Sequence, residues 1–316
     1  MISKKNIFAG DKALSPVAFG THKFGLPETE DKVAFSLLNS FVSLGGNVID
    51  TARCYAGGEG EKVIGRWLKE SGMRESVVLC TKGGEPEYTP SGTRSRINEK
   101  ELKYDFEKTF DALDTEYVDI YFLHKDDESV PVDEIMGIIS DLSKSGRVKC
   151  FGASNWTVER ILEANEYAKK NSLPTFEFSE MSFSLKDRVT KGWGEKALVL
   201  EMDKKEFECY KSCNIPLLGY NSQGYGFFDI NFEKNAWELD ESETNKKLLE
   251  TVQSICKKEG MSPSEVLFGF YNSCGIVNIP LVTTGNTKRL DGIAKACSAT
   301  LPCEYVKELM DIRFGK

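Results

Sequence analysis

Eight short apolar runs, each followed by a segment with helical periodicity, constrain the fold of this chain more than any other feature. The runs are rich in Val, Ile and aromatic residues, as buried strands are, and the segments between them repeat apolar residues every three or four positions. Strands that alternate with helices in this way form a parallel sheet. The predicted strands cover residues 17–19, 47–49, 76–81, 117–123, 148–152, 175–178, 215–220 and 276–279.

The length and composition of the chain fit one barrel. It has 316 residues, of which 40% are hydrophobic, and this is enough for a large core. Length alone suggests about two domains, but α/β barrels of this size are commonly one domain, and no linker or low-complexity tract interrupts the pattern. We therefore predict a single (β/α)8 TIM barrel over residues 1–316, with a short hairpin within residues 4–15 and extra C-terminal helices, in preference to an open doubly wound sheet.

Capping residues mark several helix boundaries. Thr29 and Thr157 precede predicted helices and can accept a hydrogen bond from the first turn. The segment 262–265, Ser-Pro-Ser-Glu, has the pattern of a capping box with proline at the first helical position. A further helix is predicted over residues 199–212, before the seventh strand.

Charge and cysteine content exclude several classes of partner. The formal net charge is -8 and the pI is about 5.2, and we find no basic patch, so nucleic acid is not an expected partner. No apolar stretch reaches the length needed to cross a bilayer, so we expect no membrane association.

Nine scattered cysteines, an odd number, argue against a disulfide framework and favour a reducing cytoplasm. The sequence does not indicate the oligomeric state.

Three polar residues close consecutive apolar runs. Asp50 follows the second predicted strand, Lys82 the third and His124 the fourth, and Tyr55 lies on the loop just beyond Asp50. Neighbouring parallel strands lie about 4.8 Å apart, and α/β proteins place their chemistry at the carboxyl ends of the strands. We therefore expect an acid, an ammonium, an imidazole and a phenol to converge at one end of the barrel.

Each of these residues alone also fits a structural role. A strand-end acid is often a helix cap or a partner in an ion pair, the same holds for a single lysine, and a single tyrosine more often packs in the core. His124 precedes Lys125-Asp126-Asp127, but no second histidine lies at ligand spacing and no Cys-x-x-Cys occurs, so we predict no metal site. A barrel hydrolase that uses Asp50 and His124 would leave Lys82 and Tyr55 unexplained.

Taken together, the four residues resemble the catalytic tetrad of the aldo-keto reductases. Asp50 with Tyr55, Lys82 in Cys-Thr-Lys and His124 in Phe-Leu-His match the family motifs in order. The segment 152–155, Gly-Ala-Ser-Asn, resembles the family's segment after the fifth strand, and the likeness runs from the opening hairpin to the last cofactor loop. The resemblance implies a nicotinamide-dependent oxidoreductase that acts on a small carbonyl or alcohol substrate.

The chemistry of carbonyl reduction gives each member of the tetrad a role. Hydride transfer builds negative charge on the carbonyl oxygen, so the site needs a proton donor, and we assign Tyr55. A phenol has an ordinary pKa of about 10, and we expect the Lys82 ammonium to lower the pKa of Tyr55. Asp50 would keep Lys82 charged, and His124 would orient the carbonyl by donating a hydrogen bond.

The resemblance also implies residues that bind the nicotinamide end of the cofactor. Ser154 and Asn155 would bind the carboxamide, and Tyr220 would stack on the ring, although a core aromatic is the alternative for Tyr220. Glu180 stands where the family usually has glutamine, and we hypothesise that its charge favours the oxidised ring. The remaining predicted contacts on this side are Gly20, Thr21, Asp50, Asn221 and Ser222.

The adenosine end is predicted at the eighth strand end, where free backbone N–H groups at a helix start favour phosphate. Arg289 matches the family arginine that contacts the 2'-phosphate of NADP, with Thr284, Thr283 and Gly285 beside it. Thr283 replaces a frequent lysine, and residues 292–293, Gly-Ile, replace the usual Glu-Asn pair near adenine. We predict NADP as the cofactor, with NAD as the alternative.

Aromatic side chains in the loops are the candidates for substrate selection, with packing as the equally weighted alternative for each. They accompany Tyr55 and His124 and are His22, Trp156, Trp193, Tyr225, Phe227, Phe228 and Trp237. The predicted function is reduction of an aldehyde or ketone with Tyr55 as general acid. The alternative is a cofactor-binding regulatory or redox-sensing subunit with slow turnover.

Overall fold

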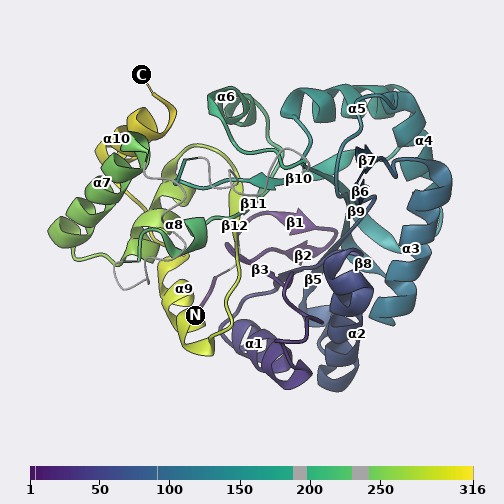
Figure 1. The fold of residues 1–316 in the computed structure, drawn as a ribbon, viewed down its shortest axis with the longest axis horizontal. Helices are drawn as coiled ribbons and strands as arrows, with labels where there is room; N and C mark the ends of the chain where they lie inside the picture. The colour runs from purple at the N-terminus through teal and green to yellow at the C-terminus, as the bar shows by residue number, and fades with distance from the viewer. Residues whose placement is uncertain (4, 91, 188–197, 230–241, 316) are drawn as a thin grey trace.

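Eight parallel strands form a closed barrel, as the sequence pattern predicts (Figure 1). The computed structural model describes residues 1–3, 5–90, 92–187, 198–229 and 242–315. Each strand pairs with the next along the chain, and the last pairs with the first. In order around the barrel the strands are β3 (Ala18–Gly20), β4 (Val48–Asp50), β5 (Val78–Gly83), β8 (Val118–Leu123), β9 (Val148–Ser154), β10 (Phe176–Ser182), β11 (Leu217–Tyr220) and β12 (Asn278–Val282).

Helices surround the barrel and cover its outer face (Figure 1). They pack on the strands because each presents an apolar stripe, such as Val63, Ile64, Trp67 and Leu68 on the second helix. Those described are α1 (Asp31–Ser43), α2 (Glu59–Ser71), α3 (Glu99–Leu113), α4 (Val132–Ser143), α5 (Val158–Lys170), α6 (Lys204–Ser212), α7 (Glu243–Glu259), α8 (Pro263–Ser273), α9 (Thr287–Ala296) and α10 (Cys303–Phe314).

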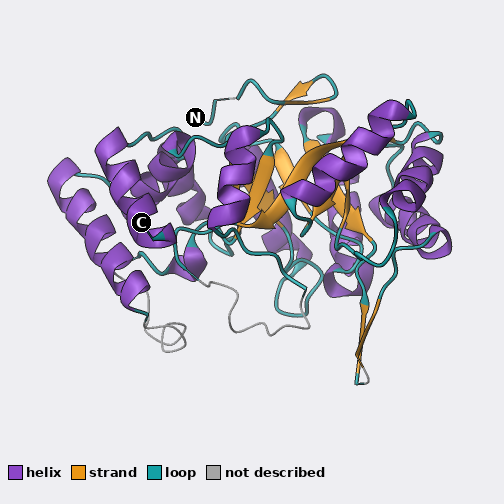
Figure 2. Cartoon of the chain, turned by 90° about the horizontal axis from the view of Figure 1, so that it is seen from above, coloured by secondary structure: helices purple, strands orange, loops and turns teal. Residues whose placement is uncertain are grey.

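Two small hairpins lie at opposite ends of the barrel (Figure 2). The predicted N-terminal hairpin, β1 (Phe8–Ala9) with β2 (Lys12–Ala13), closes the end at which the strands begin. Its Ala9 joins the apolar cluster inside the barrel. The second hairpin, β6 (Glu87–Thr89) with β7 (Gly92–Arg94), projects from the loop after β5 and was not predicted. It carries charged residues on a short exposed ribbon, so the sequence has no apolar alternation to signal it.

The strand register points the predicted catalytic residues into the barrel. Asp50 pairs with Cys80 across β4 and β5, and Cys80 belongs to the apolar cluster inside the barrel. Successive side chains on a strand face opposite sides, so Lys82, two residues beyond Cys80, faces the same interior. The two side chains therefore meet inside the barrel near its carboxyl-terminal end.

Of the four helix starts predicted above, two are confirmed and two are wrong. Thr157 caps α5, and Ser262 with Glu265 forms the predicted capping box at α8. Thr29 does not cap α1, because Glu30 occupies the cap position with extended backbone and no side-chain bond. The helix predicted from residue 199 begins only at Lys204, because Asp203 provides the cap that the earlier residues lack.

The contact between α2 and α3 depends on a glycine. A Cβ atom on Gly65 would lie 2.7 Å from the backbone oxygens of Ala112 and Leu113. We expect Gly65→Ala to lower the free energy of unfolding by about 1–3 kcal/mol, because one helix must move away from the other. Gly137→Ala in α4 is the matched control, since nothing lies within 4 Å of its Cβ position.

Chemical denaturation of the two variants provides the measurement. The control replaces an exposed helical glycine, so its stability should be unchanged or higher by up to about 1 kcal/mol. Equal stabilities for the two alanine variants would contradict the proposed close contact between α2 and α3.

Candidate active site

A cavity of about 1180 Å³ opens at the carboxyl-terminal ends of the strands. This is the end at which barrel enzymes carry their chemistry. Most of the predicted site residues line it, although they come from strand ends and loops along the whole chain. They are Gly20, His22, Asp50, Tyr55, His124, Asn155, Glu180, Tyr220, Asn221, Ser222, Thr283, Thr284, Gly285 and Arg289.

Lys82 lies fully buried beneath the floor of this cavity. Its Nζ donates to Oδ1 of Asp50 at 2.6 Å, to the carbonyl oxygen of Thr51 at 3.0 Å and to Oη of Tyr55 at 3.4 Å. Oε1 of Glu180 lies 3.3 Å from the same nitrogen. One ammonium therefore contacts two carboxyl groups and one phenol inside the barrel.

The charges in this group do not balance if both carboxyls ionise. Burial and the nearby Asp50, opposed by Lys82, together raise the pKa of Glu180 to about 8. Burial also raises the pKa of Asp50, although the contact with Lys82 opposes this. Burial alone would lower the pKa of Lys82, but Asp50 and Glu180 outweigh it and raise that pKa well above its ordinary value. Lys82 is thus held as an ammonium, and Glu180 is the carboxyl that retains a proton near neutral pH.

The environment of Tyr55 corrects one prediction. Lys82 does act to lower the pKa of Tyr55, but burial raises this pKa by more, and Asp50 and Glu180 add to the increase. The net pKa of Tyr55 is therefore raised, not lowered. Consequently, Tyr55 remains a protonated phenol, and its ring makes T-shaped contacts with His22 and His124 at centroid distances of 6.5 and 6.1 Å.

A buried ion pair anchors the loop that carries Tyr55. Arg53 bonds to the carboxylate of Glu61 at 2.5 Å, and its backbone N–H donates to the carbonyl oxygen of Lys82 at 2.9 Å. Glu61 also accepts from the hydroxyls of Thr81 at 2.7 Å and Thr109 at 2.8 Å. These bonds tie the loop after β4 to β5 and α3, so the phenol is held close to Lys82.

His124 contacts two groups that the sequence did not single out. Its Nδ1 lies 3.2 Å from Oε2 of Glu85 and 3.6 Å from Sγ of Cys54. Burial lowers the pKa of His124 well below its ordinary value, with Lys82 and Lys125 acting in the same direction. His124 is therefore a neutral imidazole. Glu85, Cys54 and Lys125 line the cavity. Each comes shortly after a barrel strand, and this place in the sequence could have identified them as site residues.

Asn155 links several of the predicted cofactor residues. Its Oδ1 accepts from Oη of Tyr220 at 2.6 Å and from the backbone N–H of Leu200 at 3.1 Å. Its Nδ2 donates to the carbonyl oxygen of His124 at 3.1 Å and to Oγ of Ser154 at 3.0 Å. In contrast, Oε2 of Glu180 is buried and has no hydrogen-bond partner within the described residues. That oxygen is one of the buried polar atoms at the cavity that a ligand amide would satisfy.

The start of α9 forms the opposite side of the cavity. Asn286 caps the helix by accepting from the backbone N–H of Lys288 at 3.0 Å. Thr284 accepts from the N–H of Asn286 at 3.1 Å, and the adjacent Gly285 and Arg289 line the cavity. Across the described part of the chain, Arg289 has no ion-pair partner within 4.0 Å. This end therefore combines a helix start with an exposed guanidinium, which suits a phosphate group.

Trp156 is not a substrate contact, which corrects that prediction. It is fully buried, with its ring 5.3 Å from Phe176 and the guanidinium of Arg160 5.3 Å from its ring. Thr21 and Ser154 are also fully buried, behind the cavity lining, and Thr21 bonds to the carbonyl oxygen of Asp50 at 2.8 Å. These two residues therefore support neighbouring groups instead of facing the cavity.

Some of the loop aromatic residues line the cavity, and others pack against neighbouring side chains. Tyr225 and Phe228 line the cavity, and Phe227 packs edge-on against Phe228 with ring centroids 4.9 Å apart. The predictions for Trp193 and Trp237 concern positions outside the described residues.

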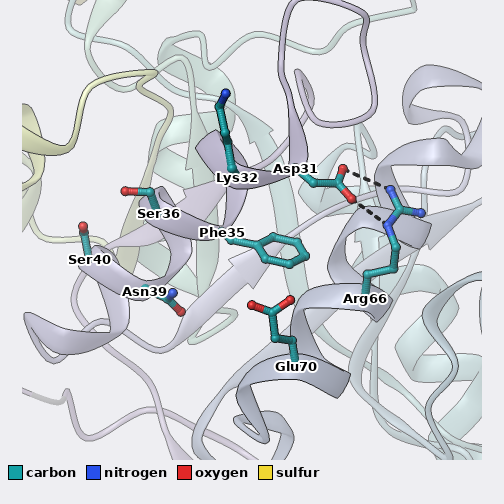
Figure 3. A pocket seen from close by; sticks show the side chains of 8 residues that line it. All are labelled: Asp31, Lys32, Phe35, Ser36, Asn39, Ser40, Arg66 and Glu70. Carbon is teal, nitrogen blue, oxygen red and sulfur yellow. Dashed lines mark hydrogen bonds and ion pairs between the residues drawn. The ribbon is translucent and has the colours of Figure 1, made fainter.

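A second hollow, of about 700 Å³, lies between α1 and α2 (Figure 3). Arg66 of α2 forms two hydrogen bonds to the carboxylate of Asp31 across it, at 2.7 and 3.0 Å. The side chains of Phe35 and Glu70 also face this space. None of its lining residues belongs to the predicted site, so the chemistry is assigned to the larger cavity.

In the described part of the chain, no helix is both long and apolar enough to span a membrane.

The chain is similar to known proteins over nearly its whole length. The model of the Aldo/keto reductase family matches residues 16–313. Norsolorinic acid reductase B of Dothistroma septosporum is 33% identical over 174 residues, which is 52% of this chain and 44% of that protein. Aryl-alcohol dehydrogenase GME11368 of Pestalotiopsis microspora is 34% identical over 172 residues, again 52% of this chain and 44% of that protein.

A bacterial relative is similar over a longer span. The uncharacterized oxidoreductase YrpG of Bacillus subtilis is 24% identical over 307 residues, which is 95% of this chain and 92% of that protein. The matches to the two fungal proteins, in contrast, span less than half of each fungal protein.

Proposed function

This chain belongs to the aldo/keto reductase family, and we propose that it reduces an aldehyde or ketone to the alcohol with NADPH. The observation that carries the proposal is the contact of one buried ammonium, Lys82, with Asp50 and with the phenol of Tyr55 at the mouth of a closed barrel. Relatives named as a reductase and as an alcohol dehydrogenase support carbonyl and alcohol chemistry of this kind. We also propose that residues 1–316 act as one domain, and the nine free cysteines support a cytoplasmic location.

Tyr55 acts as the general acid. Its raised pKa keeps it protonated, so a proton is available when negative charge develops on the carbonyl oxygen. An alkoxide is a much stronger base than a phenolate, and proton transfer from Tyr55 is therefore favourable at that stage. The Lys82 ammonium, 3.4 Å from the phenol oxygen, stabilises the phenolate that remains. In the direction of alcohol oxidation, the same phenolate acts as the base.

The residues of the cavity fit a nicotinamide cofactor, which supplies the hydride when it is bound. Glu180, with a pKa of about 8, is mostly protonated at neutral pH and so presents one donor and one acceptor, as glutamine would. Its unpartnered Oε2 would bind the carboxamide, beside Asn155 and Tyr220. At the other end of the cavity, Arg289 and the start of α9 would hold the 2'-phosphate of NADP.

The regulatory alternative remains a second candidate, since binding without rapid turnover needs the same cofactor residues. The complete group of Asp50, Lys82, Tyr55 and His124 favours catalysis. A barrel hydrolase is not supported, because it leaves the contact between Lys82 and Tyr55 without a use.

Tyr55→Phe tests the assignment of the acid. It removes the proton donor and keeps the ring, so we expect kcat for carbonyl reduction to fall by about 10²–10⁴-fold while NADPH affinity stays within a few-fold. Consumption of NADPH with a panel of aldehydes and a fluorescence titration of bound NADPH provide the two measurements. Unchanged turnover in this variant would contradict the role of Tyr55, and slow turnover by the wild type with tight NADPH binding would favour the regulatory function.

Arg289→Ala tests the choice of cofactor. Loss of a charge-assisted bond to the 2'-phosphate costs about 1.5–3 kcal/mol, so the Kd of NADPH should rise at least tenfold while that of NADH changes little. The control is Lys288→Ala, which removes the adjacent exposed cation of the same helix. A Kd for NADPH that does not change in Arg289→Ala, or that changes as much in the control, would argue against this phosphate contact.

Glu180→Gln tests the influence of the buried carboxyl on the two cofactor forms. With a pKa of about 8, Glu180 is neutral at pH 6.5 and negative at pH 9.5, and the negative charge favours the positive oxidised ring. We expect the affinity for NADP+ relative to NADPH to rise several-fold between these pH values in the wild type. The ratio should stay constant in Glu180→Gln, because the amide does not titrate. A wild-type ratio that is flat with pH would reject the hypothesis.

A further inference from the structure

Three metal-binding side chains that lie far apart in the sequence meet beside the proposed catalytic group. Cys54 lies on the loop after β4, Glu85 follows β5 and His124 follows β8. Sγ of Cys54 lies 3.6 Å from Nδ1 of His124, and Oε2 of Glu85 lies 3.2 Å from the same nitrogen. One ligand atom from each residue lies within 4.8 Å of the other two. The three residues line the cavity together.

The spacing of these atoms suits tetrahedral coordination. Zinc binds thiolate sulfur, imidazole nitrogen and carboxylate oxygen at roughly 2.0–2.3 Å, which places the ligand atoms of a tetrahedral site roughly 3–4 Å apart. The separations of 3.2 and 3.6 Å from Nδ1 of His124 fall in this range. The third separation, between the sulfur of Cys54 and the carboxylate of Glu85, lies within 4.8 Å.

One of the three ligand atoms accepts no hydrogen bond from the residues that the structure describes. Oε2 of Glu85 is buried and forms no hydrogen bond within the described residues, whereas its Oε1 accepts from the hydroxyl of Tyr88 at 2.8 Å. A buried carboxylate oxygen without a partner is costly unless something satisfies it. Nδ1 of His124 lies 3.2 Å from this oxygen and offers an imidazole nitrogen as a second ligand.

Two features of the site oppose a cation. Cys54 is a free thiol, so the ion must displace the thiol proton. Lys125 also lines the cavity beside the three residues and places a competing cation there. However, the negative charges of the Cys54 thiolate and the Glu85 carboxylate together balance the two positive charges of a divalent ion. The three side chains therefore suit a divalent metal ion.

We propose that Cys54, Glu85 and His124 form a three-ligand site for Zn²⁺ or another thiophilic divalent cation, with a fourth position open to the cavity. Binding exchanges the S–H bond of Cys54 for a sulfur–metal bond, and the proton is released to solvent. No electron is transferred.

The consequence for turnover rests on the proposed function. His124 is the residue assigned to orient the carbonyl, and an ion on its Nδ1 occupies the space next to the substrate. The ion therefore inhibits carbonyl reduction, and a chelator reverses the inhibition. The cavity thus contains a metal-sensitive control of the reductase built from residues of its own lining.

Co²⁺ provides a direct probe of the site, because a thiolate bound to it produces a near-ultraviolet charge-transfer band and a tetrahedral site produces strong visible bands. We expect both features when wild-type protein is titrated with Co²⁺ at pH 8, and we expect Zn²⁺ to remove them by displacement. Cys54→Ser should abolish the charge-transfer band, and Glu85→Gln should weaken Co²⁺ binding at least tenfold. The control Cys303→Ser changes another exposed free cysteine and should retain both features.

These spectra separate the metal site from the proposed function. Absence of the bands in folded wild-type protein, or their loss in Cys303→Ser as well, would overturn the site. Inhibition by Zn²⁺ that is equally strong in wild type and Cys54→Ser would overturn its link to turnover. Cobalt bands that depend on Cys54, in protein that consumes no NADPH with any aldehyde, would support the site and instead reject the proposed reductase activity.

Discussion

One buried ammonium holds the candidate active site together. Lys82 is fully buried, and an isolated charge at this position would be costly enough to deprotonate. Its contacts with Asp50, Glu180 and the carbonyl oxygen of Thr51 offset this cost and fix its direction inside the barrel. Tyr55 receives its hydrogen bond from the same nitrogen, so this lysine contributes to both the position and the electrostatics of the proposed acid.

The second carboxyl distinguishes this site from a simple Asp–Lys–Tyr arrangement. Two carboxylates beside one ammonium leave an excess negative charge, and burial makes that excess expensive. Glu180 therefore retains its proton near neutral pH, which lets it act as glutamine does. Above a pH of about 8 its charge appears next to Tyr55 and raises the pKa of the phenol further. The ionisation of Glu180 thus makes the acidity of the Tyr55 phenol depend on pH.

The strand-end residues could be predicted from the sequence because two simple periodicities determine their position. Alternating strands and helices predict the parallel barrel, and the two-residue period of a strand then points Asp50 and Lys82 into its interior. Trp156 was mispredicted, because its burial against Phe176 depends on how the next strand packs. The proton on Glu180 and the cluster of Cys54, Glu85 and His124 depend on distances across separate loops, which no spacing along the chain encodes.

The protonation state of Glu180 tests the central claim most directly, since the claim is that one ammonium serves two carboxyls and a phenol. Carbon-13 NMR of protein labelled at the glutamate carboxyl carbons would follow each titration with pH. The account predicts one glutamate resonance that titrates near pH 8 and is missing from Glu180→Gln. A Glu180 resonance that titrates at the ordinary glutamate pKa of about 4.3 would contradict it.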